Sequence, residues 1–127
     1  MQTNIKILVA EDIKPTQKLY DAALNDDFFE KKFADNGQIA LEYYKEFKPD
    51  IILLDIYMPI MTGFTLLKKI RHEFKDNLTK IVVVTSMNYE EDVRGCAEFG
   101  IDGYLVKPVD TEMLEQKILD IYLQQTK

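Results

Sequence analysis

Three carboxylates, one hydroxyl and one ammonium stand where short apolar runs of this sequence end. Glu11 and Asp12 follow "IKILVA", Asp55 ends "DIILLD", Thr85 ends "KIVVVT" and Lys107 follows "GYLV". If these run ends converge, two carboxylates about 4 Å apart repel by roughly 4 kcal/mol at an effective dielectric constant of about 20. Such a group of acids therefore needs protons or a cation between its members.

A divalent ion and Lys107 together would give this group a definite chemistry. Lys107 offsets one negative charge, and Mg²⁺ is the hard cation that proteins hold with one or two carboxylates and several waters. An ion with open positions, beside a lysine and a hydroxyl, suits a phosphoryl group that a carboxylate attacks in line. Aspartate is a competent nucleophile for phosphorus.

Each of these residues, taken singly, also has a plainer explanation. An aspartate at the end of a strand is most often a cap or turn residue, and "KP" is a common loop dipeptide. A threonine after a β-branched run usually belongs to the strand. Their joint placement at several strand ends favours the functional interpretation.

The elements that must position these residues alternate along the chain. Five apolar runs are typical of strands, at about residues 5–10, 28–33, 50–55, 80–85 and 103–106. Segments of helical periodicity separate them, which predicts an α/β fold: a doubly wound five-stranded parallel sheet with helices on both faces. Such a sheet places its ligand site beyond the carboxyl ends of the strands, where the five residues stand.

Helical periodicity also predicts where the helices lie and which faces they bury. Three helices are expected after the Asp35–Gly37 turn, between Asn88 and about Phe99, and after Asp110, with Asn88 and Glu91 as a capping box. Two buried faces are predicted in detail: Leu19, Ala23 and Leu24 in the helix after Pro15, and Leu66, Leu67, Ile70 and Phe74 in the helix after Gly63.

Length and composition exclude several functional classes. The 127 residues suffice for one domain, expected over residues 1–127. The formal net charge of -6 argues against nucleic acid or an anionic membrane as a partner. We see neither a signal peptide nor a run long enough to cross a membrane. Cys96, the single cysteine, cannot form an internal disulfide, so we expect a reduced, cytoplasmic protein. The Cys96 side chain is expected to be packed in the core.

Four motifs of the chain resemble those of the response-regulator receiver domain of two-component signalling. They are "ILVAED", "DIILLDIYMP" with Gly63 shortly after it, "VVVTS" and "GYLVKP", and the resemblance covers residues 5–123. The spacing agrees as well: thirty positions separate Asp55 from Thr85, and twenty-two separate Thr85 from Lys107. The resemblance implies a flavodoxin-like sheet with strand order 2-1-3-4-5.

The resemblance also implies a magnesium site and a phosphoacceptor. Asp55 would accept a phosphoryl group from a histidine of a sensor histidine kinase or a histidine phosphotransfer protein. Asp12 and Asp55 would ligate Mg²⁺, Glu11 would do so through water, and the backbone carbonyl of Tyr57 would be a further ligand.

Three other residues receive roles from the same resemblance. Thr85 would hydrogen-bond the phosphoryl group, and Lys107 would pair with it. Tyr104 matches the switch aromatic that turns inward as Thr85 moves. The bond between Lys107 and Pro108 would be cis, a geometry that proline makes accessible.

The function implied is a phosphorylation-driven switch and not an enzyme with a diffusible substrate, apart from Mg²⁺-assisted autodephosphorylation. Output would pass to a downstream protein through the face of the fourth helix, fifth strand and fifth helix. The chain would be a stand-alone regulator or the receiver segment of a larger hybrid kinase or phosphorelay, as a monomer or a phosphorylation-dependent dimer. Tyr57 and Met87 would flank the mouth of the site without orienting water.

Two other classes share parts of this pattern. A flavodoxin-like electron carrier would need hydroxyls and amides in its first loop to hold the flavin phosphate, whereas "AEDIKP" presents acids there. A Mg²⁺-dependent aspartyl phosphatase of the haloacid-dehalogenase type needs a second acid two residues after the nucleophile. That position is Tyr57 here. Both alternatives are therefore disfavoured.

Overall fold

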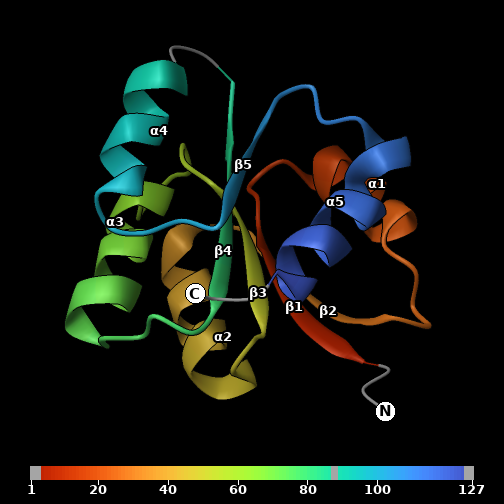
Figure 1. The fold of residues 1–127 in the computed structure, drawn as a ribbon, viewed down its shortest axis with the longest axis horizontal. Helices are drawn as coiled ribbons and strands as arrows, with labels where there is room; N and C mark the ends of the chain where they lie inside the picture. The colour runs from red at the N-terminus through yellow and green to blue at the C-terminus, as the bar shows by residue number, and fades with distance from the viewer. Residues whose placement is uncertain (1–3, 87–88, 125–127) are drawn as a thin grey trace.

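The computed structural model describes residues 4–86 and 89–124, which form a five-stranded parallel sheet of order β2-β1-β3-β4-β5 (Figure 1). The strands are β1 Ile5–Ala10, β2 Phe29–Ala34, β3 Ile51–Asp55, β4 Lys80–Thr85 and β5 Gly103–Val106. The helices are α1 Lys14–Ala23, α2 Gly37–Phe47, α3 Gly63–Lys68 with its continuation η1 Lys69–Glu73, α4 Tyr89–Ala97 and α5 Thr111–Leu123. The predicted fold class and strand order are confirmed.

Helices cover both faces of the sheet, with α2, α3 and α4 on one side and α1 and α5 on the other (Figure 1). Successive residues of a strand point to opposite faces. Leu8, Ile52 and Val83 therefore belong to the core under α2 and α3. Their neighbours Val9 and Leu53 belong to the core under α1 and α5. Burial on both faces explains why these strands are continuous apolar runs.

Polar side chains fix where three of the helices begin. Asn36 accepts a hydrogen bond from the Ile39 N–H at the start of α2, at 2.9 Å. Asp110 accepts one from the Glu112 N–H at the start of α5, at 3.0 Å. Thr62 caps α3 in the same way. These caps satisfy N–H groups that have no partner inside the helix. The predicted capping box of α4 includes Asn88, which lies outside the described residues.

The buried face of α1 differs from the predicted one. Leu19 is 57% exposed, so its predicted place in the core is wrong. Leu24 is buried as predicted, and it shares the buried face with Gln17 and Tyr20, which were not predicted. Their spacing of three and four residues is as helical as the predicted set, so periodicity alone could not choose between the two faces.

The helix after Gly63 widens into a π-turn, which the sequence did not predict. The Phe74 N–H donates to the Lys69 carbonyl at 2.9 Å, a bond that spans five residues instead of four. The extra residue shifts the helical register, so Ile70 and its neighbour Arg71 are both buried. Phe74, predicted to be in the core, is 39% exposed for this reason.

The helices are short compared with the thickness of a bilayer. A membrane-spanning helix needs about 20 predominantly apolar residues. The longest helix among the described residues, α5, has 13 residues. Within residues 4–86 and 89–124, no helix has the length and apolar character to cross a membrane.

Candidate functional site

The strand register brings three acids together at the carboxyl edge of the sheet. Ala10, the last residue of β1, pairs with Leu54, so Glu11 and Asp12 emerge beside Asp55. Each of the three carboxyl groups offers an oxygen, and these atoms all lie within 4.8 Å of one another. The spacing of the apolar runs therefore led to the correct set of neighbours.

Lys107 follows β5 and reaches the same cluster across β4, which lies between β5 and β3. The pairing of Thr85 with Val106 aligns β5 on β4, and the Lys107 N–H donates to the Thr85 carbonyl at 2.8 Å. The ammonium donates to Asp55 Oδ2 at 2.9 Å and lies 3.2 Å from Glu11 Oε1. The Lys107–Pro108 bond is cis, as expected.

Glu11 is the most deeply buried acid of the cluster, at 1% exposure. Its Oε2 accepts a hydrogen bond from the Ile13 N–H at 3.0 Å. Its Oε1 is buried and accepts no hydrogen bond, although the Lys107 ammonium is at ion-pair distance. Burial raises the pKa of Glu11 and the charge of Asp55 adds to this effect, while the Ile13 hydrogen bond and Lys107 oppose it. The cluster therefore holds more negative charge than the protein compensates.

Asp55 is held at both oxygens. Oδ1 accepts a hydrogen bond from the Tyr57 N–H at 3.2 Å, and Oδ2 accepts the one from Lys107. Burial works against the charge of Lys107, but the hydrogen bond to Asp55 and the charges of Asp55 and Glu11 outweigh it, so the pKa of Lys107 is raised. The ammonium therefore remains charged beside Asp55 at neutral pH.

Gly63 allows the chain after Asp55 to fold back against the sheet. A Cβ atom at Gly63 would lie 2.1 Å from the Asp55 carbonyl oxygen, a distance no side chain can tolerate. The Gly63 N–H donates to the Ile56 carbonyl at 2.8 Å, which closes the loop. This close approach is the physical reason for a glycine soon after "DIYMP".

Gln17, which lies outside the predicted face of α1, supports the turn that carries the acids. Its side chain is 7% exposed. Its amide nitrogen donates to the Glu11 carbonyl at 2.5 Å and to Asp35 Oδ1 at 2.8 Å. Lys14 donates to the same Asp35 oxygen at 2.8 Å, and these bonds from Lys14 and Gln17 lower the pKa of Asp35. Gln17 thus ties the turn after β1 to the turn after β2.

Of the residues predicted to act as the switch, Thr85 lies at the carboxyl edge of the sheet and Tyr104 lies near the start of β5. Thr85 is fully buried at the end of β4. Tyr104 on β5 pairs with Val83 and is 50% exposed, so its ring lies outward in this structure. Tyr57, predicted at the mouth of the site, is 56% exposed. Met87 lies outside the described residues.

The donor set fits a magnesium ion. Glu11, Asp12 and Asp55 supply hard carboxylate oxygens, the ligands that Mg²⁺ prefers. The buried Glu11 Oε1, which accepts no hydrogen bond, is the kind of group that a bound cation or its water would satisfy. Chemically, the arrangement can hold a cation and a dianionic group next to Asp55.

Comparison with known proteins agrees with this geometry. The family model described as the response regulator receiver domain matches residues 7–119. The chemotaxis protein CheY of Halobacterium salinarum is 33% identical over 116 residues, which are 91% of this chain and 95% of that protein. Response regulator PleD of Caulobacter vibrioides is 34% identical over 113 residues, which are 89% of this chain but only 25% of PleD.

A solved structure extends the likeness to three dimensions. It contains the Saccharomyces cerevisiae histidine phosphotransfer signalling protein Ypd1 and the receiver domain of its downstream response regulator Ssk1. The match has a TM-score of 0.83 at 28% identity, over 94% of this chain and 90% of that chain. Together with the family match across residues 7–119, these similarities show that the chain belongs to the response regulator receiver domain family of two-component signalling.

Proposed function

We propose that this chain is a phosphorylation-activated switch in which Asp55 accepts a phosphoryl group in a Mg²⁺-dependent reaction. The observation that carries the proposal is the contact between Asp55 Oδ2 and the Lys107 ammonium, at 2.9 Å, inside a cluster of three acids. A carboxylate that is held next to a fixed cation can attack phosphorus while the cation pairs with the phosphoryl oxygens.

The transfer forms one bond and breaks one bond. A carboxylate oxygen of Asp55 attacks the phosphorus of a phosphohistidine, the N–P bond breaks, and its electron pair returns to the imidazole nitrogen. Glu11, Asp12 and Asp55, with the Tyr57 carbonyl, would hold Mg²⁺, which when bound supplies positive charge that lowers the repulsion between carboxylates and phosphoryl oxygens. Lys107 keeps its proton and turns from Asp55 to the phosphoryl group.

The phosphodonor would be a sensor histidine kinase or a histidine phosphotransfer protein. Support comes from the similar Ssk1 receiver domain, whose solved structure includes the phosphotransfer protein Ypd1. A hollow of about 370 Å³ also adjoins Lys107, between α1 and the start of α5. Ile13 and Leu19 line it and are 48% and 57% exposed, so an apolar protein surface could cover it.

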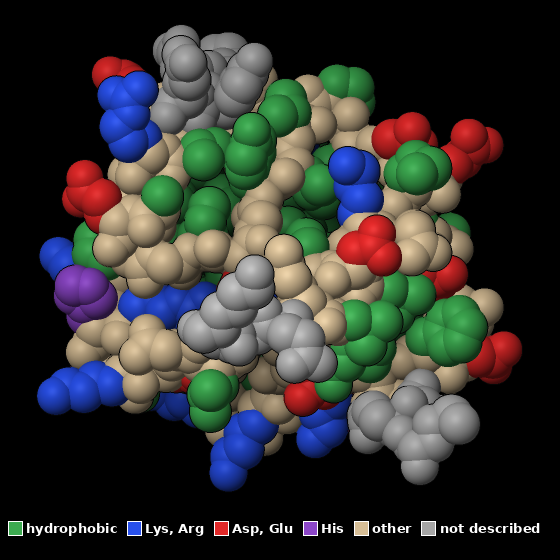
Figure 2. Space-filling view, in the orientation of Figure 1, with side chains coloured by type: hydrophobic (Ala, Val, Ile, Leu, Met, Phe, Trp, Pro, Cys, Tyr) green, Lys and Arg blue, Asp and Glu red, His purple; other side chains and the backbone are tan. Residues whose placement is uncertain are grey.

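Output would occur through the face formed by α4, β5 and α5. Figure 2 shows hydrophobic side chains gathered in its upper middle, over this face. On β5, Tyr104 is 50% and Val106 is 39% exposed. An inward turn of Tyr104 towards Thr85 on phosphorylation would change this surface and thus its affinity for a downstream protein. The same switch could serve a stand-alone regulator or a segment of a longer protein.

Incubation with Mg²⁺ and acetyl phosphate tests the proposal directly. We expect intact-mass spectrometry to show one added phosphoryl group, which hydroxylamine removes as it does other acyl phosphates. Asp55→Ala should abolish the addition. Asp27→Ala, which removes an exposed acid far from the cluster, is the matched control and should be labelled like the wild type. Equal labelling of Asp55→Ala would refute the assignment of Asp55.

A further inference from the structure

A second hollow lies at the opposite end of the sheet, between the end of α2 and the segment that joins η1 to β4. We name it the α2–β4 groove. Its volume is about 460 Å³, and it is lined by Tyr44, Lys45, Lys48, Pro49, Phe74, Asp76, Leu78 and Thr79. β4 separates it from the Asp55 end, because the strand covers six residues, a length of roughly 20 Å.

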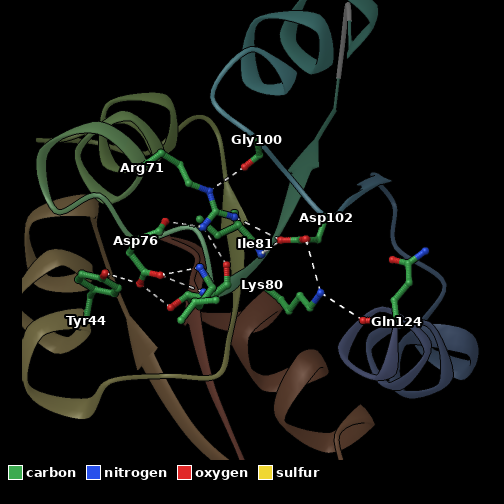
Figure 3. Close-up of polar contacts among 10 residues, drawn as sticks. Tyr44, Arg71, Asp76, Lys80, Ile81, Gly100, Asp102 and Gln124 are labelled. Carbon is green, nitrogen blue, oxygen red and sulfur yellow. Dashed lines mark hydrogen bonds and ion pairs between the residues drawn. The ribbon is translucent and has the colours of Figure 1, made fainter. Parts of the chain in front are cut away.

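Hydrogen bonds hold the floor of the groove rigid. Figure 3 shows Tyr44 of α2 pointing towards Asp76. The Tyr44 hydroxyl donates to Asp76 Oδ2 at 2.5 Å, and the Thr79 hydroxyl donates to the same oxygen at 2.6 Å. Oδ1 accepts from the N–H groups of Leu78 and Thr79. Asp76, the one acid among the lining residues, therefore has both oxygens occupied by internal donors.

The centre of the groove is apolar and open to solvent. Leu78 is 90% exposed and Phe74 is 39% exposed. The Phe74 ring is fixed against Tyr44, with 5.8 Å between the ring centroids. An exposed leucine beside an aromatic ring on a rigid floor is a surface on which an apolar side chain can be buried.

Two lysines at the end of α2 flank this apolar centre. The Lys45 ammonium lies 5.5 Å from the centroid of the Phe74 ring, and Lys48 at the end of α2 is exposed. Among the described residues, neither lysine has a carboxylate within 4.0 Å. Figure 2 shows basic side chains gathered along the lower left edge of the molecule, over the ends of α2 and α3. The positive charge is local to this surface, because the whole chain carries a net charge of -6.

We propose that the α2–β4 groove is a docking site for an acidic, leucine-containing segment of a partner protein, and that docking does not depend on phosphorylation of Asp55. A leucine of the partner would cover Leu78 and Phe74, and flanking carboxylates would pair with Lys45 and Lys48. A nucleic acid fits less well, because the centre of the groove offers the aliphatic surface of Leu78 and the Lys45 ammonium already lies over the Phe74 ring. A receiver domain with such a site would stay attached to a partner through the whole phosphorylation cycle.

A defined peptide probe tests the proposal. The probe is a fluorescent synthetic peptide in which two leucines four positions apart are embedded in glutamates. We expect saturable binding to the intact chain, measured by fluorescence anisotropy, with amide shifts of Leu78 and Thr79 in ¹⁵N spectra. Lys45→Glu with Lys48→Glu should weaken binding about tenfold, and Leu78→Ser should do the same. Treatment with beryllofluoride should leave the affinity unchanged within about twofold.

Two variants and two peptides act as controls. Lys117→Glu and Leu123→Ser change an exposed lysine and an exposed leucine of α5 and should bind the probe like the wild type. A peptide with serine for leucine, and one with lysine for glutamate, should not bind. The docking site would be overturned if the α5 variants lost as much affinity for the probe as the groove variants. Binding of the basic peptide, or amide shifts confined to other surfaces, would overturn it as well. An affinity that changes strongly with beryllofluoride would overturn its independence from Asp55.

Discussion

Arg71 at the amino end of the sheet and Glu11 at the carboxyl end are both buried charges, yet their surroundings differ. Every nitrogen of the Arg71 guanidinium donates a hydrogen bond (Figure 3): to the carbonyls of Gly100, Asp76 and Thr79, at 2.8 to 2.9 Å, and to Asp102 Oδ2 at 3.2 Å. Glu11, in contrast, shares one lysine with Asp55 and keeps an oxygen that accepts no hydrogen bond.

The difference distinguishes charges that are fully paired inside the protein from charges that need a bound cation. Asp102, the partner of Arg71, also accepts a hydrogen bond from the Ile81 N–H at 2.8 Å, so both members of the pair are satisfied inside the protein. Removing Asp102 would leave the buried Arg71 without this counter-charge, whereas Asp102, 27% exposed, would keep the Ile81 N–H if Arg71 were removed. At the carboxyl end the excess of acid is satisfied only when a cation arrives. At the amino end, stability should therefore depend mainly on which side chains are present. At the carboxyl end, it should depend on whether Mg²⁺ is present in solution.

Arg71→Met should have the largest effect on stability. The substitution keeps much of the apolar stem but leaves three carbonyls without their donor and Asp102 without its arginine, at a cost of about 3 to 5 kcal/mol in the free energy of unfolding. Urea denaturation measures this cost. Arg94→Met, at an exposed position of α4, is the matched control and should cost less than about 0.5 kcal/mol. Similar losses in both variants would mean that the Arg71 network contributes little.

Mg²⁺ should have the next largest effect, and at the other end. At a hundredfold excess over Kd, binding stabilises the fold by about 2.7 kcal/mol, which thermal unfolding at matched ionic strength measures. Asp12→Asn removes one repelling charge, so without metal it should be more stable than the wild type and should lose most of the response to Mg²⁺. Asp27→Asn should respond like the wild type.

The opposite result for Asp12→Asn would give this residue a different role. If the variant melted lower than the wild type without metal and still responded fully to Mg²⁺, Asp12 would be a structural cap and not a ligand. The repulsion between Glu11 and Asp55 would then have to account for any stabilisation by the ion.

At the amino end, a fall in pH should remove the contribution of the Asp76 carboxylate to the free energy of unfolding. Burial favours the neutral form of Asp76, but hydrogen bonds from Thr79 and Tyr44 outweigh it and lower its pKa from 3.8 to about 2. A carboxyl with a lowered pKa stabilises the fold above its unfolded pKa, and this contribution is lost as pH falls from about 4 to about 2. The stability gap between the wild type and Asp76→Asn should therefore be constant near neutral pH and narrow across that window. A gap independent of pH down to about 2 would contradict the assignment.

Much of this architecture follows from patterns that are local in the sequence. Aliphatic runs such as Ile51–Leu54 are typical of strands covered on both faces, and a parallel sheet then brings their carboxyl ends together, which places Asp55 beside Glu11. The network around Arg71 could not be read in this way. Its partners lie up to 31 positions away, and a charged residue near the end of a helix usually faces solvent. The π-turn before Phe74 likewise has no local signal.

Gln17 supports the site but lies outside the helix face that periodicity predicted, and its substitution has the smallest predicted effect. Gln17→Met keeps the length of the side chain but removes the hydrogen bonds to the Glu11 carbonyl and to Asp35. The turn that carries Glu11 and Asp12 should then hold Mg²⁺ less well, with a Kd about tenfold higher by isothermal titration calorimetry, the lower end of what loss of a supporting residue costs a metal site.

A loss of stability alone would not establish this role, because the substitution also removes one buried and one partly buried hydrogen bond, at a cost of about 1 to 3 kcal/mol. Tyr44→Phe provides the comparison at the amino end. It deletes the hydrogen bond to Asp76 and should lower stability to a similar degree, while its affinity for Mg²⁺ stays that of the wild type. Gln17→Lys, which can still donate to both oxygens, should recover most of the affinity. If Gln17→Met and Tyr44→Phe bind the ion equally well, Gln17 supports only the fold and not the position of the acids.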